Sequence, residues 1–264
     1  MRKITLITVS IGILLFACNN RKPKTVNEVK LPLEEKSETD KLISEILEDK
    51  SFTDFFETFI WDEEFQKTRI VFPLKKDNKT IQTSKDWKHL PFYTTSEFIP
   101  ILSSDTLSEL YDKEVTTSKI GLFLIDFKRE IADKYNFEKI DSKWFLQSLE
   151  SLSINKAPDF EFIDFLTKFT SDSVFQINHI LFPLPVSLID YDDDYEIIEK
   201  TVLKEDWKCL QWTMVQLMVL SNIDTKNKYR NIHIRGVENG IGVEYIFENI
   251  NGNWKLVRFE DYSM

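Results

Sequence analysis

Two stretches of the chain carry apolar residues at the spacing of a buried helix face. The stripes consist of Phe52, Phe55, Phe56 and Phe59 and of Phe162, Phe165, Leu166 and Phe169. Each stripe predicts a helix that packs an aromatic face into a core. A short second helix is expected after each, with Asp62 and Asp172 accepting hydrogen bonds from the free amides of its first turn.

Alternating apolar residues then predict strands in both stretches. Runs with period two follow the helices at 70–74 and 180–184, and the proline inside each run suits an edge strand or a bulge. Further on, two Asn-Gly hairpin signals place three antiparallel strands at 229–237, 241–249 and 253–261. Weaker turns near 128–130 and 141–142 predict the same meander earlier in the chain. Helices followed by a strand meander indicate an α+β fold, with helices on one face of a bent sheet.

The two stretches are similar residue by residue. FQKTRIVFPL at 65–74 and FQINHILFPL at 175–184 align at an offset of 110, and 11 of 23 positions across 52–74 are identical. The offset becomes 120 at Asp86-Trp87-Lys88 and returns to 110 from Tyr135 onward. Three matching blocks in the same order predict a tandem duplication. We therefore expect two domains, residues 41–152 and residues 159–264.

One predicted strand of each domain is apolar on both faces. The two faces of residues 120–127 carry Ile120, Leu122 and Leu124 and, opposite them, Phe123, Ile125 and Phe127; residues 214–220 repeat the feature. An antiparallel strand with water on one side should alternate with polar residues, so something must cover the second face. The other domain is the nearest cover, and we expect a monomer whose two sheets pack together as an intrachain pseudo-dimer. A buried helix at 214–220 is the alternative.

The first residues predict export and lipidation. Arg2 and Lys3 precede an uncharged apolar run from Ile4 to Phe16, which is shorter than a membrane-spanning helix requires. Residues 1–17 are typical of a signal peptide, and their junction with Cys18 resembles the bacterial lipobox. That resemblance implies that Cys18 carries an acyl chain such as palmitate; a short signal anchor is the alternative. Residues 18–40 mix charges and prolines, which predicts a polar tether.

Charge and cysteine content narrow the classes of partner. The 34 Lys and Arg against 44 Asp and Glu give a net charge of −10, which disfavours electrostatic binding to nucleic acid or anionic lipid. Membrane attachment would therefore depend on the acyl chain, and we expect a lipid-anchored protein of the bacterial cell envelope, periplasmic or at the outer membrane. Cys209 is the only other cysteine, so stability must come from packing and not from an intrachain disulfide.

The element order and the ending YIFENINGNWKLVRFED resemble the NTF2-like, cone-shaped α+β fold. The whole chain, with its lipobox, polar tether and two copies of FQ and FPL, is similar to a family of Bacteroidetes lipoproteins with a domain of unknown function, number 4348. These resemblances imply a tandem duplication of two NTF2-like cone domains, each with helices packed on a curved antiparallel sheet. They imply no activity.

Signatures of metal or cofactor binding are missing from the sequence. His89, His179 and His233 are scattered singly, without the spacing of a zinc site. The acidic run DYDDDYE at 190–196 lacks the glycine and the glutamate that a calcium loop places at its sixth and twelfth positions. We therefore expect no metal and no cofactor, and we interpret the acidic run as a solvated hairpin tip.

A ligand site is expected in the hollow between helix and sheet, because ligand pockets are apolar hollows with a few polar groups. The candidate lining residues occupy paired positions of the two copies: Arg69 and His179, Trp87 and Trp207, Tyr135 and Tyr245, with Glu138 and Glu248 near the tyrosines. NTF2-like enzymes such as ketosteroid isomerases combine a carboxylate base with an oxyanion donor. Here Tyr135 and Glu138 lie three apart on a strand, and therefore on opposite faces.

The sequence thus favours a binding or scaffolding module without a catalytic residue. Its ligand would be a small molecule, a glycan or an envelope protein. An NTF2-like enzyme of the isomerase or hydrolase type is the alternative, and a structural spacer is the third interpretation.

Overall fold

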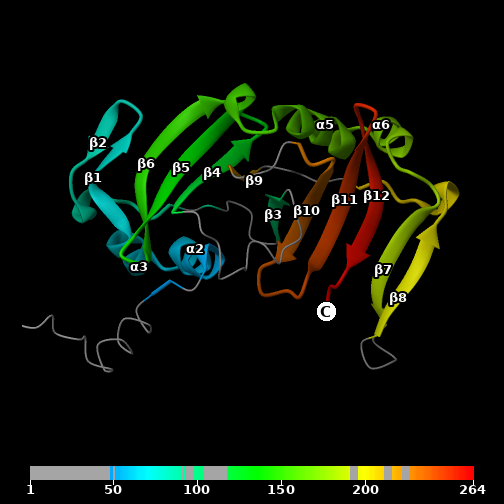
Figure 1. Ribbon diagram of the computed structural model, residues 1–264, viewed down its shortest axis with the longest axis horizontal. Coiled ribbons are helices and arrows are strands. Elements are labelled where there is room, and N and C mark those ends of the chain that lie inside the picture. The colour runs from blue at the N-terminus through cyan, green and yellow to red at the C-terminus, as the bar shows by residue number, and fades with distance from the viewer. Residues whose placement is uncertain are drawn as a thin grey trace, which may run out of the picture. The chain divides into compact units, whose positions relative to one another are not determined.

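The computed structural model describes residues 48–49, 51–90, 92, 98–103, 118–190, 196–210, 216–221 and 226–264 (Figure 1). Cys18, the predicted signal peptide and the predicted tether lie outside these residues, as does most of the acidic run. Residues 45–264 form one compact unit. Within it we call residues 48–153 the first half and residues 159–264 the second half.

The first half begins with two helices, and its strands follow. Its elements are α2 (Phe52–Trp61), α3 (Glu63–Thr68), β1 (Ile70–Lys76), β2 (Lys79–Ile81), the 3-10 helix η1 (Ser84–Asp86), β3 (Phe98–Ser103), β4 (Lys119–Asp126), β5 (Ile131–Ile140) and β6 (Lys143–Ser153). Asp62 accepts a hydrogen bond from the Phe65 amide at 2.9 Å, which confirms its predicted capping role. The pairing of β1 with β6 shifts register between Ile70 and Lys75, around the proline that predicted a bulge.

The second half repeats this order. After the 3-10 helix η2 (Ile154–Lys156) come α5 (Phe160–Ser171), α6 (Ser173–Asn178), β7 (Leu184–Asp190), β8 (Glu196–Val202), η3 (Lys204–Asp206), β9 (Leu217–Leu220), β10 (Tyr229–Gly236), β11 (Gly242–Ile250) and β12 (Asn253–Asp261). The three predicted meander strands are confirmed to within a residue or two. One predicted strand starts late: Ile180 makes only an isolated bridge to Leu256, and β7 begins at Leu184.

All strands join one mixed sheet, in the order β2-β1-β6-β5-β4-β9-β3-β10-β11-β12-β7-β8. At its centre the halves exchange a strand. The first half's β3 pairs with β10 of the second half, while the second half's β9 pairs with β4 of the first. The expected face-to-face packing of two sheets is therefore wrong in its geometry, because these strands join the sheets edge to edge. The described part of the alternative helix at 214–220 is strand β9.

The exchange explains why β4 and β9 are apolar on both faces. Leu122 and Leu124 belong to the core cluster under α2, whereas Phe123 and Ile125 belong to the cluster under α5. On β9, Met218 belongs to the cluster under α2 and Leu217 to the cluster under α5. Because successive side chains of a strand point to opposite faces, α2 and α5 cover opposite faces of the sheet where the halves meet.

The doubled FQ motif has the same structural task in both halves. Gln66 is fully buried; its amide donates to the Phe59 carbonyl at 2.9 Å, and its Oε1 accepts from Trp87 Nε1 at 2.8 Å and from the Leu90 amide at 2.9 Å. Gln176 forms the matching bonds with Phe169, Trp207 and Leu210. Each glutamine thus connects the first long helix of its half to the segment that follows η1 or η3.

Candidate functional site

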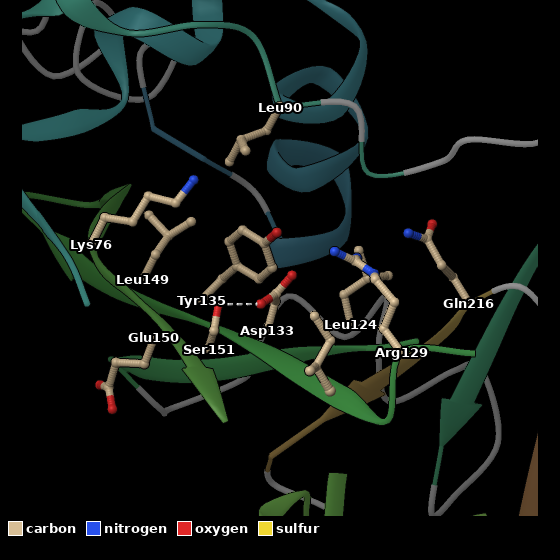
Figure 2. Close-up of a pocket in the computed structure, with 11 residues that line it drawn as sticks. Lys76, Leu90, Leu124, Arg129, Asp133, Tyr135, Leu149, Glu150, Ser151 and Gln216 are labelled. Atoms are coloured by element: carbon tan, nitrogen blue, oxygen red, sulfur yellow. Dashed lines mark hydrogen bonds between the residues drawn. The ribbon is translucent and has the colours of Figure 1, made fainter. Parts of the chain in front are cut away.

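A cavity of about 320 Å³ opens between β5, β6 and the segment after η1 in the first half (Figure 2). Its apolar walls and polar groups come from four strands and three connecting segments. The lining residues are Lys76, Leu90, Leu124, Arg129, Ile131, Asp133, Tyr135, Leu149, Glu150, Ser151 and Gln216. This volume lies at the lower end of the range for small-molecule sites.

Strand alternation and register bring the central residues of the cavity together. Asp133 and Tyr135 are two apart on β5, so both side chains point to the same face of the sheet. On the neighbouring strand β6, Leu149 lies opposite Tyr135 and Ser151 lies opposite Asp133. Gln216, just before β9, is the second half's contribution, and it reaches the cavity because β9 pairs with β4.

Hydrogen bonds already engage some of the polar groups. Ser151 Oγ donates to Asp133 Oδ1 at 2.6 Å, and Arg129 Nε donates to Asp126 Oδ2 at 2.6 Å. Burial raises the pKa of Tyr135, and the negative charge of Asp133 raises it further, so the phenol keeps its proton. The cavity therefore holds a neutral tyrosine donor close to a carboxylate.

Apolar side chains pack in the equivalent region of the second half. At the offset of 110, Val186, Val243 and Phe259 stand where the first half has Lys76, Asp133 and Leu149. Phe259 lies opposite Tyr245 on β12, and the two rings pack with their centroids 4.9 Å apart. Val186 is buried, and Val243 and Phe259 pack against the same core. Two polar side chains of the first half are thus replaced by valines, and Leu149 is replaced by the larger ring of Phe259.

Of the six residues proposed from the sequence, Tyr135 is the one that lines this cavity. Trp87 donates to Gln66, and Trp207 donates to Gln176. Tyr245 lies in the packed core of the second half. Arg69 forms a bidentate ion pair with Asp49, at 2.8 and 2.9 Å. His179 stacks on Phe175, with ring centroids 3.8 Å apart.

Sequence reasoning missed Lys76, Asp133 and Ser151 because it considered positions that the two copies share or exchange between polar types. The useful signal at Lys76 and Asp133 was a difference: these positions become Val186 and Val243 in the second copy, whereas Ser151 becomes Asp261, another polar residue that the comparison overlooked. Alternation along β5 would also have placed Asp133 beside Tyr135. Glu138, the carboxylate considered from the sequence, lies three residues after Tyr135 and therefore on the opposite face of the strand.

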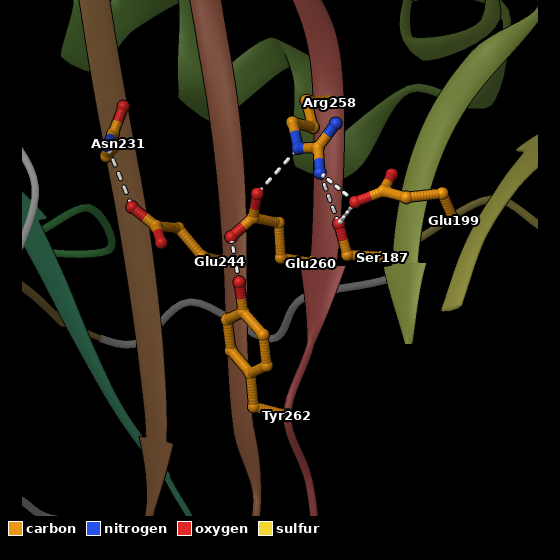
Figure 3. Close-up of polar contacts among 7 residues, drawn as sticks. All are labelled: Ser187, Glu199, Asn231, Glu244, Arg258, Glu260 and Tyr262. Atoms are coloured by element: carbon orange, nitrogen blue, oxygen red, sulfur yellow. Dashed lines mark hydrogen bonds and ion pairs between the residues drawn. The ribbon is translucent and has the colours of Figure 1, made fainter. Parts of the chain in front are cut away.

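A second polar cluster lies on β10, β11, β12, β7 and β8, on the sheet face opposite Tyr245 (Figure 3). Glu260 accepts from Arg258 Nε at 2.6 Å and from the Tyr262 hydroxyl. Arg258 also contacts Ser187 and bonds to Glu199 at 2.7 Å. These groups satisfy one another, and none of them lines the cavity described above.

Two buried titratable groups lie at the inner end of this cluster. Burial raises the pKa of Glu244, the charge of Glu260 raises it further, and a 2.8 Å hydrogen bond from Asn231 opposes the rise. His233 lies opposite Glu244 in register; burial, with the charge of Arg235, lowers its pKa to about 4. Both side chains are therefore favoured in their neutral forms by the folded protein.

Two features are missing from the described ranges: a cluster of metal-ligating side chains and a helix able to span a membrane. No group of three or more His, Cys, Asp or Glu side chains in these residues could hold a metal ion. Among the described helices, none combines the length and the hydropathy that a membrane-spanning segment needs.

Comparison with known proteins places the chain in a family. A crystal structure of an NTF2-like protein from Bacteroides fragilis NCTC 9343 is similar, with 26% sequence identity and a TM-score of 0.66, over 81% of this chain and 97% of that one. No curated protein matches the sequence significantly. The family model of a domain of unknown function, DUF4348, matches residues 35–261. The chain, a mixed α+β protein with few helices on a large sheet, therefore belongs to the DUF4348 family.

Proposed function

We propose that this protein is a lipid-anchored binding module of the bacterial cell envelope, in which the first half binds a small molecule and the second half supports it. The observation that carries the proposal is the difference between the halves. The first has a cavity lined by Lys76, Asp133 and Tyr135, and the second has Val186, Val243 and Phe259 packed in the same place. A hollow with apolar walls and a few convergent polar groups is typical of a small-molecule site.

We infer a tandem duplication, with domains at 41–152 and 159–264, as the origin of this arrangement. The offset of 110 in the sequence, the repeated order of helices and strands, and the matching bonds of Gln66 and Gln176 support it. One copy could then lose its cavity and gain core packing while the other kept it.

Two features support the lipid anchor. The residues around Cys18 resemble a lipobox, and the net charge of −10 leaves little electrostatic attraction to an anionic bilayer, so attachment would need an acyl chain. Substituting Cys18→Ala is expected to abolish incorporation of labelled palmitate and firm membrane attachment. Equal labelling of the wild type and the variant would refute the anchor without touching the cavity.

The binding proposal is tested by giving the first half the aromatic residue of the second. Leu149→Phe should fill the cavity, because Phe259 occupies the equivalent position beside Tyr245. We expect the fluorescence of 4-(dimethylamino)benzonitrile, a small neutral dye whose emission depends on the polarity around it, to rise on binding to the wild type and to stay low with Leu149→Phe. Filling a cavity commonly stabilises a protein by about 0.5–2 kcal/mol, so the variant should melt at the same temperature or higher.

The reciprocal variant Phe259→Leu serves as the control, because it changes the filled half and leaves the first cavity intact. It should keep the dye binding of the wild type. Unchanged dye binding by a folded Leu149→Phe variant would contradict the proposal.

An enzyme of the isomerase or hydrolase type is the second candidate, and one observation favours it. Asp133 and Tyr135 line the same cavity, and a carboxylate base beside a protonated phenol can move a proton and stabilise an oxyanion. Turnover of a p-nitrophenyl ester or of a β,γ-unsaturated ketone by the wild type, lost in Asp133→Asn, would support catalysis. Equal rates for the two proteins would count against it.

A further inference from the structure

The polar groups of the cavity differ in whether they already have partners. Each carboxylate of the cavity already accepts one hydrogen bond: Asp133 from Ser151, and Glu150 from Asn136 Nδ2 at 3.1 Å. In Figure 2 the Glu150 carboxylate points away from Tyr135. By contrast, the Lys76 ammonium, the Tyr135 hydroxyl and the Gln216 amide form no hydrogen bond or ion pair with any residue in the described part of the chain. The unengaged groups of the cavity can all donate.

From this imbalance, and resting on the proposed binding function, we propose that the cavity takes a small molecule with an apolar body and a carboxylate head, the head being bound by Lys76. The apolar body would lie against Leu124, Ile131 and Leu149. The exposed position of Lys76 places the head at the mouth of the cavity, where a charged group need not lose all its water. A charge-assisted hydrogen bond from an ammonium to a carboxylate is among the stronger polar contacts.

The other polar groups define the orientation of the head. Tyr135 keeps its proton and is therefore a donor to an anion and not a competing charge. Arg129 is held by Asp126, and Asp133 lies on the same strand as Tyr135, two residues away. In the view of Figure 2, Lys76 lies to the left of Tyr135, Leu90 lies above it, and Arg129 and Gln216 lie to its right. A carboxylate at the Lys76 ammonium would lie on the opposite side of the Tyr135 ring from Asp133 in this view.

The sequence of the second half supports this assignment. The position of Lys76 is Val186 there, and the position of Asp133 is Val243, so the ammonium is absent where the cavity is filled. A volume of about 320 Å³ holds about ten non-hydrogen atoms at the volume of roughly 30 Å³ that a water molecule occupies in its liquid. Octanoate has this size and the required chemistry.

The test compares octanoate with 1-octanol, which has the same apolar chain and no charge. Each is titrated against 4-(dimethylamino)benzonitrile bound to the full-length protein, and its dissociation constant is measured by displacement of the dye. We expect the wild type to prefer octanoate by about tenfold, the scale of one charge-assisted contact. Lys76→Met should bring that preference close to one while leaving 1-octanol binding within about twofold. Tyr135→Phe should weaken octanoate more than 1-octanol.

Lys75→Met is the matched control, because Lys75 is the neighbouring residue on β1 and does not line this cavity. It should keep the tenfold preference. Equal affinities of the wild type for octanoate and 1-octanol, or a preference that survives Lys76→Met, would overturn the carboxylate assignment and leave the binding function standing. Failure of both compounds to displace the dye, with the same dye signal from Leu149→Phe, would instead overturn the binding function itself.

Discussion

Burial makes the charged form of a side chain unfavourable, and Glu244 is an example in this protein. Glu244 is 9% exposed and lies between His233 and Glu260 in the register of the sheet. Its partner Asn231 supplies one hydrogen bond, which does not offset its burial and the charge of Glu260. The residue therefore makes the stability of the fold depend on pH.

The sign of this dependence follows from proton linkage. Because the folded pKa of Glu244 is raised above 4.5, the folded state binds more protons than the unfolded state as the pH rises from 4.5 through the folded pKa. The contribution of Glu244 to the free energy of unfolding is thus present at low pH and is lost across this window. We expect Glu244→Gln to be more stable than the wild type at pH 8, with a difference that shrinks toward pH 4.5. Urea unfolding at several pH values measures it, and a constant difference would contradict the buried carboxylate.

At the scale of elements, β4 shows how one strand serves two cores. Leu122 and Ile125 are both fully buried, yet Leu122 packs in the cluster with α2 and Ile125 in the cluster with α5. Alternation along the strand separates the two side chains onto opposite faces. A strand of the first half is therefore part of the core of the second half.

The pair Leu122→Ala and Ile125→Ala tests this division. Each truncation should lower the free energy of unfolding by about 2–5 kcal/mol, because each leaves a cavity in a packed core. Backbone amide chemical shifts should report the location: changes in α5 for Ile125→Ala and in α2 for Leu122→Ala. Shift changes in α2 for both variants would show that the clusters are assigned wrongly.

The sequence predicted the elements well and their assembly less well. The aromatic stripes, the capping aspartates and the Asn-Gly turns are local signals, and α2, α5 and the strands from β10 to β12 agree with them. The alternation of residues 120–127 also showed that both faces are covered. The alternation could not show that β3 and β9 pair with strands of the other half. Strand pairing depends on contacts between residues distant in sequence, and the spacing of apolar residues along one strand does not specify them.

The candidate site shares one residue, Tyr135, with the set named from the sequence. A hollow between helix and sheet was expected, whereas strands and connecting segments line the cavity, and the remaining candidates serve the packing of each half. Residues shared by two copies report what both copies need, which is the fold. The residues that distinguish a hollow copy from a filled one, such as Lys76 against Val186, appear only in the differences.

At the scale of the molecule, neither half has a complete sheet of its own. The strand β9 belongs to the second half, yet both of its neighbours, β4 and β3, belong to the first. Strand β10 likewise pairs with β3 on one side. Separating the halves would expose unpaired backbone groups and the apolar faces that the other half covers.

We therefore expect residues 159–264, expressed alone, to self-associate or to remain unfolded, whereas the full-length protein is a monomer. Sedimentation equilibrium gives the mass in solution, and circular dichroism reports folding. A soluble, folded and monomeric 159–264 fragment would contradict the shared sheet, since its β9 would then need no partner from the first half.

The two similarly built halves differ in that the first holds an open cavity where apolar side chains pack in the second. The most direct measurement is a crystal structure of the protein with 8-bromooctanoate, whose bromine is located by anomalous scattering. We expect one bromine site per chain, in the first half between Leu124 and Leu149, with the carboxylate toward Lys76. Bromine in the core around Phe259, or none in the first half, would contradict the account.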